Sequence, residues 1–187
     1  MCRPRALVSR SLIAIGALAV SIAVPADGLI GNGGFNAGLG PPWGTGLYSE
    51  GRPVWWNSPG CRSEVSLDET VAMEGLASLH IINPSARAAQ VYGTVAQRIP
   101  IEPNRPYRIT VWVRGLDLAS AGAVSVVVDE AWQVRPIVLP PGSYAWTRLS
   151  GTFSLPASHA DIRILAEDAG EVWLDDLQVL PLDSVLY

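Results

Sequence analysis

The feature that most constrains this chain is a succession of short, strand-like segments with no amphipathic helix between them. The clearest segment spans residues 107–114, where apolar and polar residues alternate with a period of two and therefore face opposite sides of a strand. The Pro-rich stretch at residues 103–106 reads as the turn before it. After residue 40, no stretch shows the apolar period of a three-turn helix. The pattern predicts an all-β fold.

Nine further segments are rich in Val, Ile, Thr and aromatic residues, and turns containing Gly or Pro separate them. These segments are Val54–Trp56, Glu64–Leu67, Ser78–Ile82, Ala89–Ile99, Ala123–Val128, Arg135–Leu139, Thr147–Leu155, Ile162–Ala166 and Glu171–Val179. Strands in this number without helical crossovers predict antiparallel sheets packed face to face. The chain shows no internal repeat and no low-complexity linker, so we expect a single β-sandwich domain.

Residues 1–26 have the organisation of a secretory signal peptide. A basic start precedes an apolar run over residues 12–24, which is shorter than the roughly 20 residues that a membrane-spanning helix needs. Val24 and Ala26 fit the small-residue positions of a cleavage site. We therefore expect residues 27–187 to form the mature domain, secreted, periplasmic or at the cell surface, with no membrane insertion after cleavage. An uncleaved anchor is the alternative.

Charge and composition narrow the possible partners. The chain has a net charge of −4, and without residues 1–26 its 10 Arg stand against 17 Asp and Glu, a net charge of −7. No basic cluster appears, which argues against an electrostatic nucleic-acid binder. A hydrophobic content of 49% with 16% charged residues excludes a disordered chain. An anionic surface suits neutral ligands or cations.

The cysteines offer no internal disulfide. Cys2 belongs to the expected signal peptide, so Cys61 stands alone in the mature domain. We expect Cys61 to be a small buried hydrophobic residue. A partner in an intermolecular disulfide is one alternative, and a nucleophile without a supporting His is another.

Five motifs then occur in a characteristic order. They are Leu29–Asn36 followed by Trp43, Gly75–Ile81, Val95–Ile99 ahead of Tyr107–Val113, Trp146–Phe153, and Val172–Val179. This order resembles carbohydrate-binding modules of the family 4, 9 and 22 type, which are β-sandwich jelly rolls of the galactose-binding-like superfamily. The resemblance spans residues 29–180 and implies both that fold and the binding of a glycan. Jelly rolls of this kind also serve as structural or protein-contacting modules.

The resemblance implies that aromatic side chains hold a neutral polysaccharide, because the apolar C–H face of a sugar stacks on a flat ring. We expect a binding face built from aromatic platforms and from polar residues that read the sugar hydroxyls. The platforms are Trp55 or Trp56, Tyr92, Trp112 and Trp132, and the readers are Gln90, Arg114 and Glu130.

The placement of these residues follows from the expected strands. Trp55 and Trp56 are adjacent, so they point to opposite faces of a strand. Tyr92 is expected on the strand Ala89–Ile99, on the same face as Gln90 and Thr94, and Trp132 is expected in a loop. The remaining candidates, Trp146 and Trp173, fall within the closing motifs and are expected to pack in the core or against a sheet.

The resemblance also implies a structural calcium ion between the N-terminal motif and the closing strand. The matching positions are Asn36, Asp175 and Asp176. Calcium prefers several oxygen ligands, and Asn36 supplies a neutral amide where such modules often have a carboxylate, which should weaken binding. The alternative is that Asp175 or Asp176 forms a hydrogen bond to a turn.

No motif for catalysis accompanies these features. The chain lacks a nucleophile elbow, a zinc-protease motif, a phosphate loop and a Cys-x-x-Cys pair. His80, expected in a strand, and His159, expected in a loop, lack metal-ligand spacing. We therefore expect a secreted, non-catalytic carbohydrate-binding module. The alternatives are an envelope or matrix scaffold that contacts protein and, more distantly, a small jelly-roll glycoside hydrolase with two facing carboxylates.

Overall fold

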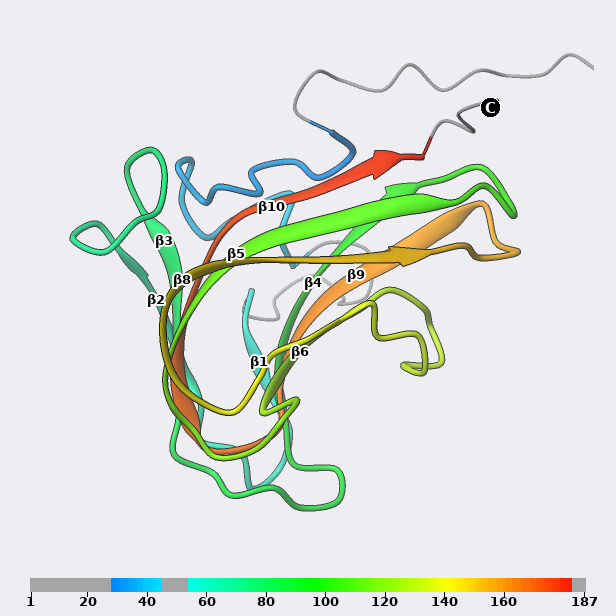
Figure 1. Ribbon diagram of the computed structural model, residues 1–187. Helices are drawn as coiled ribbons and strands as arrows, with labels where there is room; N and C mark the ends of the chain where they lie inside the picture. Colours follow the sequence, from blue (N-terminus) through cyan, green and yellow to red (C-terminus); the bar gives the residue numbers. More distant parts are fainter. Residues whose placement is uncertain (1–27, 45–53, 183–187) are drawn as a thin grey trace, which may run out of the picture.

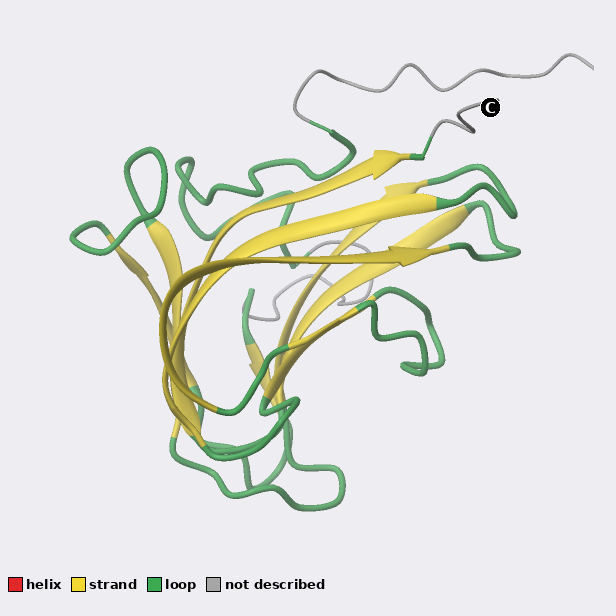
Figure 2. Ribbon diagram, viewed as in Figure 1, coloured by secondary structure: helices red, strands yellow, loops and turns green. Residues whose placement is uncertain are grey.

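The computed structural model describes residues 28–44 and 54–182, so the expected signal peptide lies outside the described residues. This part of the chain forms ten strands and no helix (Figure 2), and none of it could span a membrane as a helix. The strands are β1 (Trp56–Asn57), β2 (Glu64–Asp68), β3 (Ser78–Asn83), β4 (Gly93–Pro100), β5 (Tyr107–Leu118), β6 (Val124–Val127), β7 (Ile137–Val138), β8 (Gly142–Phe153), β9 (His159–Ala166) and β10 (Gly170–Pro181).

The strands build two five-stranded antiparallel sheets that face each other. One has the order β1-β4-β9-β6-β7 and is called the β9 sheet after its central strand; the other has the order β2-β3-β10-β5-β8 and is called the β10 sheet. The long strands β5, β8 and β10 bend strongly, so that the β10 sheet curves around the β9 sheet (Figure 1). This is the β-sandwich that the strand pattern predicts.

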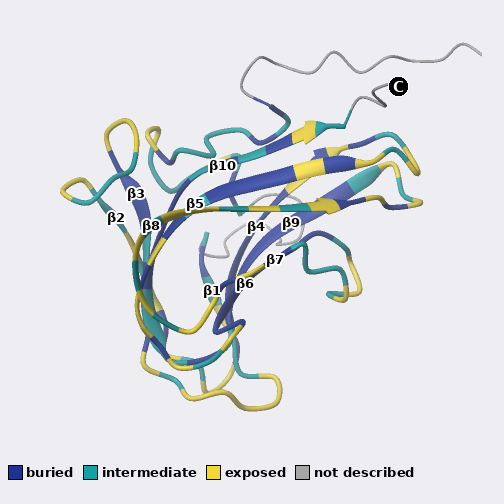
Figure 3. Ribbon diagram, viewed as in Figure 1, coloured by how far each residue is buried: buried dark blue, intermediate teal, exposed yellow. Residues whose placement is uncertain are grey.

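The core fills the space between the sheets. On β5, Ile109, Val111 and Val113 are fully buried, whereas the side chains between them face away from the β9 sheet. Ile162 and Ile164 of β9 meet them from the opposite side. Buried residues accordingly occur along the central strands of both sheets (Figure 3). Each such aliphatic side chain contributes about 1.5–3 kcal/mol to folding.

The N-terminal segment 28–44 closes one end of the sandwich. Phe35 and Trp43 are buried and stack with ring centroids 5.5 Å apart. Gly33 accepts a backbone hydrogen bond from Leu177, at a register shift in β10. A Cβ at Gly33 would collide with the carbonyl oxygen of Leu177, so only glycine permits this approach.

Each expected strand has a counterpart in the structure, but β1 and β7 have only two residues each and β8 begins at Gly142, before the expected Thr147. Three further expectations need correction. The strand expected over Ala89–Ile99 begins at Gly93, because Gln90 adopts a positive φ of 63° and a turn links Val91 to Ala88. His159, expected in a loop, is the first residue of β9. Cys61 was expected to be buried but is half-buried, with its Sγ 3.4 Å from the hydroxyl of Ser63.

Candidate functional site

Three aromatic side chains from separate segments meet on the outer face of the β9 sheet. We call Trp56, Tyr92 and Trp132 the aromatic cluster. The ring centroids of Trp56 and Tyr92 lie 5.4 Å apart, and those of Tyr92 and Trp132 lie 4.9 Å apart. All three residues are half-buried. The cluster therefore presents partly exposed rings at a face that the core does not use.

Strand pairing explains the position of Trp56. Trp56 pairs with Thr94 of β4, and residues directly opposite in an antiparallel pair share a face. Trp55 points the other way: it is only 7% exposed and donates its indole N–H to Ser63. The expectation that these two residues point to opposite faces is confirmed, and Trp56 is the one that reaches the cluster.

Tyr92 reaches the cluster from the turn before β4, not from the strand itself. Its backbone is clamped to Ser58: the Tyr92 N–H donates to the Ser58 hydroxyl at 2.8 Å, and the Ser58 N–H donates to the Tyr92 carbonyl at 2.9 Å. Tyr92 therefore precedes the strand, but its ring contacts Trp56, which pairs with Thr94, so Tyr92 lies on the same side of the β9 sheet as Thr94. Gln90 is exposed in the same turn. The hydrogen bonds to Ser58 take the place of the expected strand pairing.

The loop between β6 and β7 places Trp132 over β9, as the sequence predicts for a loop residue. This loop lies on the side of the β9 sheet that faces away from the β10 sheet (Figure 1). The Asp129 carboxylate accepts backbone hydrogen bonds from Gln133 and Val134 at 2.9 and 2.8 Å, which closes the loop. Below the indole of Trp132, the guanidinium of Arg163 lies 4.9 Å from the ring centroid. One face of this indole is therefore covered by a buried cation.

An ion-pair network fixes the loop to the sheet. Asp161 is completely buried and accepts two hydrogen bonds from Arg98, at 2.6 and 2.9 Å, and one from Arg163 at 3.3 Å. Arg98 also donates to Glu130 at 2.9 Å, and Arg163 donates to the Asp129 carbonyl at 2.7 Å. The hydrogen bonds to Asp161 raise the pKa of Arg98. The buried carboxylate thus connects β4, β9 and the loop that carries Trp132.

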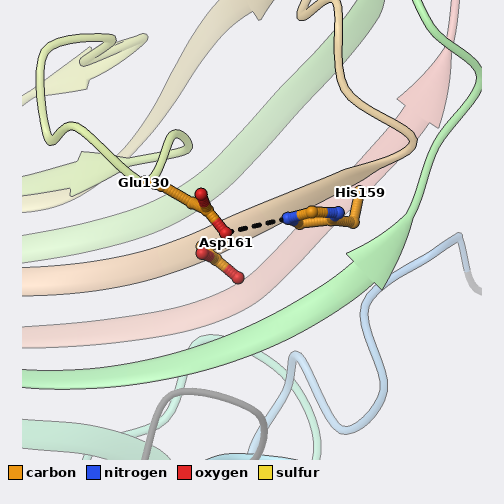
Figure 4. A group of neighbouring side chains, drawn as sticks. All are labelled: Glu130, His159 and Asp161. Carbon is orange, nitrogen blue, oxygen red and sulfur yellow. Dashed lines mark hydrogen bonds and ion pairs between the residues drawn. The ribbon is translucent and has the colours of Figure 1, made fainter.

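Glu130, His159 and Asp161 bring potential metal-ligand atoms within 4.8 Å of one another. Glu130 and His159 point toward each other, 3.1 Å apart, beside the carboxylate of Asp161 (Figure 4). The guanidinium groups of Arg98 and Arg163 already occupy both oxygens of Asp161. A divalent cation there would meet two positive charges at contact range. The group is therefore an ion-pair network rather than a metal centre.

A cavity of about 370 Å³ opens beside the cluster, lined by Tyr92, Trp132, Gln90 and two ionised residues. These two charged residues are Arg135, in the loop before β7, and Glu167, directly after β9; they form an ion pair with a second contact at 3.2 Å. This pair raises the pKa of Arg135. The cavity thus combines aromatic rings with fixed hydrogen-bond donors and acceptors.

Trp112 and Arg114 lie on the opposite side of the molecule from the cluster. Both belong to β5, and they face outward from the β10 sheet, so the expectation of one common binding face is wrong for them. The guanidinium of Arg114 lies 5.0 Å from the ring centroid of Trp173, which in turn stacks on His80 at 4.5 Å. Period-two alternation identifies the face of a strand but not which sheet the strand joins. That assignment decides which aromatic residues meet.

Trp173 and Trp146 were expected to pack in the core or against a sheet. Trp173 is 6% exposed and packs on the outer face of its own sheet, where its indole N–H donates to Asp68 at 2.9 Å. This confirms the sheet-packing interpretation for Trp173. Trp146 is half-buried on the edge strand β8.

The sequence analysis missed the charged residues that support the cluster. Asp161 and Arg163 alternate with apolar residues on β9, in the same period-two pattern as on β5. Two buried charges on the non-core face of a central strand indicate a polar structure covering that face. The alternation was therefore the available signal. No comparable alternation in the sequence pointed to Arg135 and Glu167 as neighbours of the cluster.

Two of the positions expected to hold calcium, Asp175 and Asn36, accept hydrogen bonds from backbone N–H groups. One oxygen of Asp175 accepts backbone N–H groups from Met73 and Glu74 at 2.9 Å each, and its other oxygen accepts from Asp176 at 2.7 Å. The amide oxygen of Asn36 accepts from Leu76 at 2.5 Å. Calcium binds through several oxygens at 2.3–2.6 Å, and these hydrogen bonds compete with that role. The arrangement agrees with the alternative that Asp175 bonds a turn.

Burial raises the pKa of Asp175, although its three backbone hydrogen bonds oppose that effect. The Asp175 carboxylate is fully buried and joins β10 to the turn at residues 73–74. Asp176 is half-buried and accepts from the side chain of Gln178 at 2.6 Å. Both aspartates therefore have structural partners within this end of the sandwich.

Comparisons with known proteins support the fold. No protein-family model matches the sequence, and no curated protein sequence is similar to it. Among the solved structures, TmCBM61, determined in complex with β-1,4-galactotriose, matches with a TM-score of 0.56 and 13% identity, covering 83% of this chain and 99% of that chain. The C-terminal family 22 carbohydrate-binding module of Clostridium thermocellum Xyn10B matches with a TM-score of 0.52 and 17% identity, covering 88% and 100%.

A CBM4 structure matches at a TM-score of 0.54 and 15% identity, covering 82% of this chain and 99% of that chain. The enzymatically active domain of tailspike protein 4 from bacteriophage CBA120 also matches, at a TM-score of 0.54 and 12% identity, but this chain spans only 22% of that chain. These matches show a shared fold. The described domain has the jelly-roll fold of carbohydrate-binding modules, as the order of the sequence motifs indicated.

Proposed function

We propose that this protein is an exported, non-catalytic module that holds a neutral glycan against the aromatic cluster. The observation that carries the proposal is the convergence of Trp56, Tyr92 and Trp132, from three separate segments, on a sheet face that the core does not use. A jelly roll of the same fold, TmCBM61, was determined with a bound β-1,4-galactotriose. The cluster therefore supplies aromatic surface on a scaffold that also serves sugar binding elsewhere.

The ring geometry favours a soluble chain or a chain end over a flat crystalline surface. The planes of Trp56 and Tyr92 are inclined by 52°, and those of Tyr92 and Trp132 by 74°. Rings at these angles cannot form one flat platform. Because Arg163 covers one face of the Trp132 indole, a sugar would stack on the other face, next to the cavity.

Polar groups around the cavity are suited to forming hydrogen bonds with sugar hydroxyls. Gln90 is exposed, and Arg135 and Glu167 hold each other in fixed orientations. Ordered donors and acceptors of this kind cost little entropy on binding. Glu130 lies on the far side of the Trp132 loop, where Arg98 and His159 bind it. Glu130 thus supports the loop, and Gln90, Arg135 and Glu167 take the role of hydroxyl readers.

The carboxylates near the cluster also favour binding over hydrolysis. A glycosidase needs one carboxylic acid that donates a proton and a second carboxylate across the scissile bond. Glu130 and Glu167 each form an ion pair with an arginine, so a guanidinium group already occupies each carboxylate. Neither carboxylate is therefore free to face a second one across a glycosidic bond.

Affinity electrophoresis on soluble β-galactan, xylan, β-glucan and mannan tests the proposal. We expect retardation on one of these neutral glycans, at micromolar affinity or weaker. Trp132→Ala and Trp56→Ala should each weaken binding by about 2 kcal/mol, near thirtyfold, because each removes a ring that stacks on the sugar. Trp112→Ala, on the opposite sheet, is the matched control and should leave the affinity unchanged.

Two results would contradict the proposal. One is a folded protein that no glycan retards, which would favour the scaffold that contacts protein. The other is retardation that survives both Trp132→Ala and Trp56→Ala, which would place the glycan elsewhere on the molecule.

A further inference from the structure

A second groove, unrelated to the aromatic cluster, runs along the outer face of the β10 sheet. Its volume is about 620 Å³, larger than the cavity beside Trp132. It lies over the three neighbouring strands β10, β5 and β8. Because the two sheets face opposite sides of the molecule, a ligand in this groove would not compete with one at the cluster.

Strand register explains how the groove is lined. Thr110 pairs with Gln178 of β10 and with Ser150 of β8, so these three polar side chains form one row across the strands. Arg108 pairs in the same way with Leu180 and Thr152 in the next row. Residues directly opposite in antiparallel pairs share a face.

Arg148 completes the groove from the other end of these rows. It pairs with Trp112 and leans back so that its guanidinium lies 3.4 Å from the Thr110 hydroxyl. Arg148 and Arg108 both line the groove, although four residues separate their rows along the strands. Their side chains therefore approach the hydroxyl row from opposite ends.

The charge of the groove is unlike that of the rest of the protein. Its lining contains two arginines and no carboxylate, in a chain whose net charge is −4. Neither Arg108 nor Arg148 forms an ion pair with a carboxylate of the described residues, whereas Arg87, Arg98 and Arg135 each do. The two guanidinium groups therefore keep their bidentate hydrogen-bonding capacity for an anion.

Protection of a sheet edge does not account for both arginines. Charged residues on an edge strand prevent pairing with another chain, and Arg148 lies on the edge strand β8. Arg108 lies on β5, between β8 and β10, where no edge is exposed. A cation at that position, beside a row of hydroxyl and amide groups, needs another explanation.

We propose that this groove binds an acidic saccharide through its anionic group, either a uronate carboxylate or a sulfate ester. The two arginines would hold the anion, and Thr110, Ser150 and Gln178 would bond the neighbouring hydroxyls. Leu180, 39% exposed at the rim, offers an apolar contact for a C–H face. The choice of a saccharide as ligand rests on the proposed function, whereas the preference for an anion rests on the groove alone.

The test compares three probes on the full protein: oligogalacturonate, a sulfated galactan and a neutral galactan. We expect one or both anionic probes to bind, and added salt to weaken that binding. Substituting both arginines (Arg108→Ala with Arg148→Ala) should reduce the affinity for the anionic probe at least tenfold, because the variant loses both charge-assisted contacts with the anion. Both side chains are exposed, so the double variant should keep the wild-type Tm.

Matched variants separate this site from its alternatives. Arg62→Ala removes one positive charge from an exposed position outside the groove and should leave the affinity for the anionic probe unchanged, whereas each single groove variant, Arg108→Ala or Arg148→Ala, should lower it. An equal loss in Arg62→Ala would overturn the proposal in favour of general charge attraction. The absence of binding to both anionic probes would also overturn it.

Trp132→Ala distinguishes the two sites. It should impair the binding of neutral glycan and leave the binding of the anionic probe intact, and the double arginine variant should do the reverse. If Trp132→Ala lost the binding of the anionic probe and the double arginine variant kept it, the anionic ligand would bind at the aromatic cluster, and the proposal for the groove would be overturned. If the protein bound no neutral glycan, the proposed function would be contradicted, but the result for the anionic probe and the groove would still stand.

Discussion

Asp161→Asn tests most sharply how the Trp132 loop is held. The substitution keeps the shape of the side chain but removes the negative charge between Arg98 and Arg163. Asp161 is completely buried, and the side chain of Arg163 is 3% exposed. The variant therefore leaves a buried guanidinium without its carboxylate.

The magnitude follows from this burial. Removing one partner of a buried ion pair costs about 3–5 kcal/mol, because the remaining charge stays desolvated. At about 2–4 °C per kcal/mol for a domain of this size, the Tm should fall by about 6–20 °C. Glu130→Gln makes the same chemical change at a carboxylate that also contacts Arg98 but is 66% exposed. Such an exposed pair contributes about 0–1 kcal/mol.

Urea unfolding and thermal melts of both variants measure this difference. A loss near 3 kcal/mol or more in Asp161→Asn, with less than about 1 kcal/mol in Glu130→Gln, is the expected result. Equal small losses in the two variants would refute the reasoning, because Asp161 would then not act as a buried counter-ion. The intrinsic fluorescence of Asp161→Asn should also change in the folded state, as the ring of Trp132 loses its fixed neighbour.

Three further predictions concern stability. The Ser120 hydroxyl, together with backbone N–H groups, lowers the pKa of Asp168. The Asp168 carboxylate therefore contributes fully to folding stability above the ordinary Asp pKa of 3.8, and this contribution is lost as the pH falls through the lower pKa of the folded state. In urea unfolding, Asp168→Asn should lose less stability below about pH 4 than the wild type does. Excess chelator should leave the Tm unchanged, because Asp175 already accepts three backbone hydrogen bonds; a fall in Tm that calcium reverses would refute this. Gly151→Ala should destabilise by about 1–3 kcal/mol in urea, since its Cβ would collide with the backbone carbonyl of Pro136; an unchanged midpoint would contradict that packing.

Most of the fold could be predicted because the strands and turns of a β-sandwich produce local patterns in the sequence. Period-two alternation on β5 identified the buried residues Ile109, Val111 and Val113, and Gly- and Pro-containing turns separated the strands. The expectation failed at Gln90, where a positive φ ends the pairing before the strand begins. A non-glycine residue of this kind gives no clear sequence signal.

The candidate site could be predicted only in part, for a different reason. The sequence indicated Tyr92, Trp132 and one of Trp55 and Trp56 as exposed aromatic residues, and Tyr92, Trp132 and Trp56 do meet. Trp112 was selected by the same reasoning but lies on the other sheet. Alternation gives the face of each strand, whereas the pairing of distant strands decides which faces coincide. The network at Asp161 depends on such long-range pairing as well, so it emerged only from the structure.

The central claim is that a glycan binds at the aromatic cluster, and the indole N–H resonances of the seven Trp residues test it most directly. Titration with the neutral glycan that retards the protein most strongly should shift the resonances of Trp56 and Trp132. Trp112, Trp146 and Trp173, which belong to strands of the β10 sheet, should keep their positions. Shifts confined to those three residues would contradict the account and place the glycan on the opposite face of the sandwich.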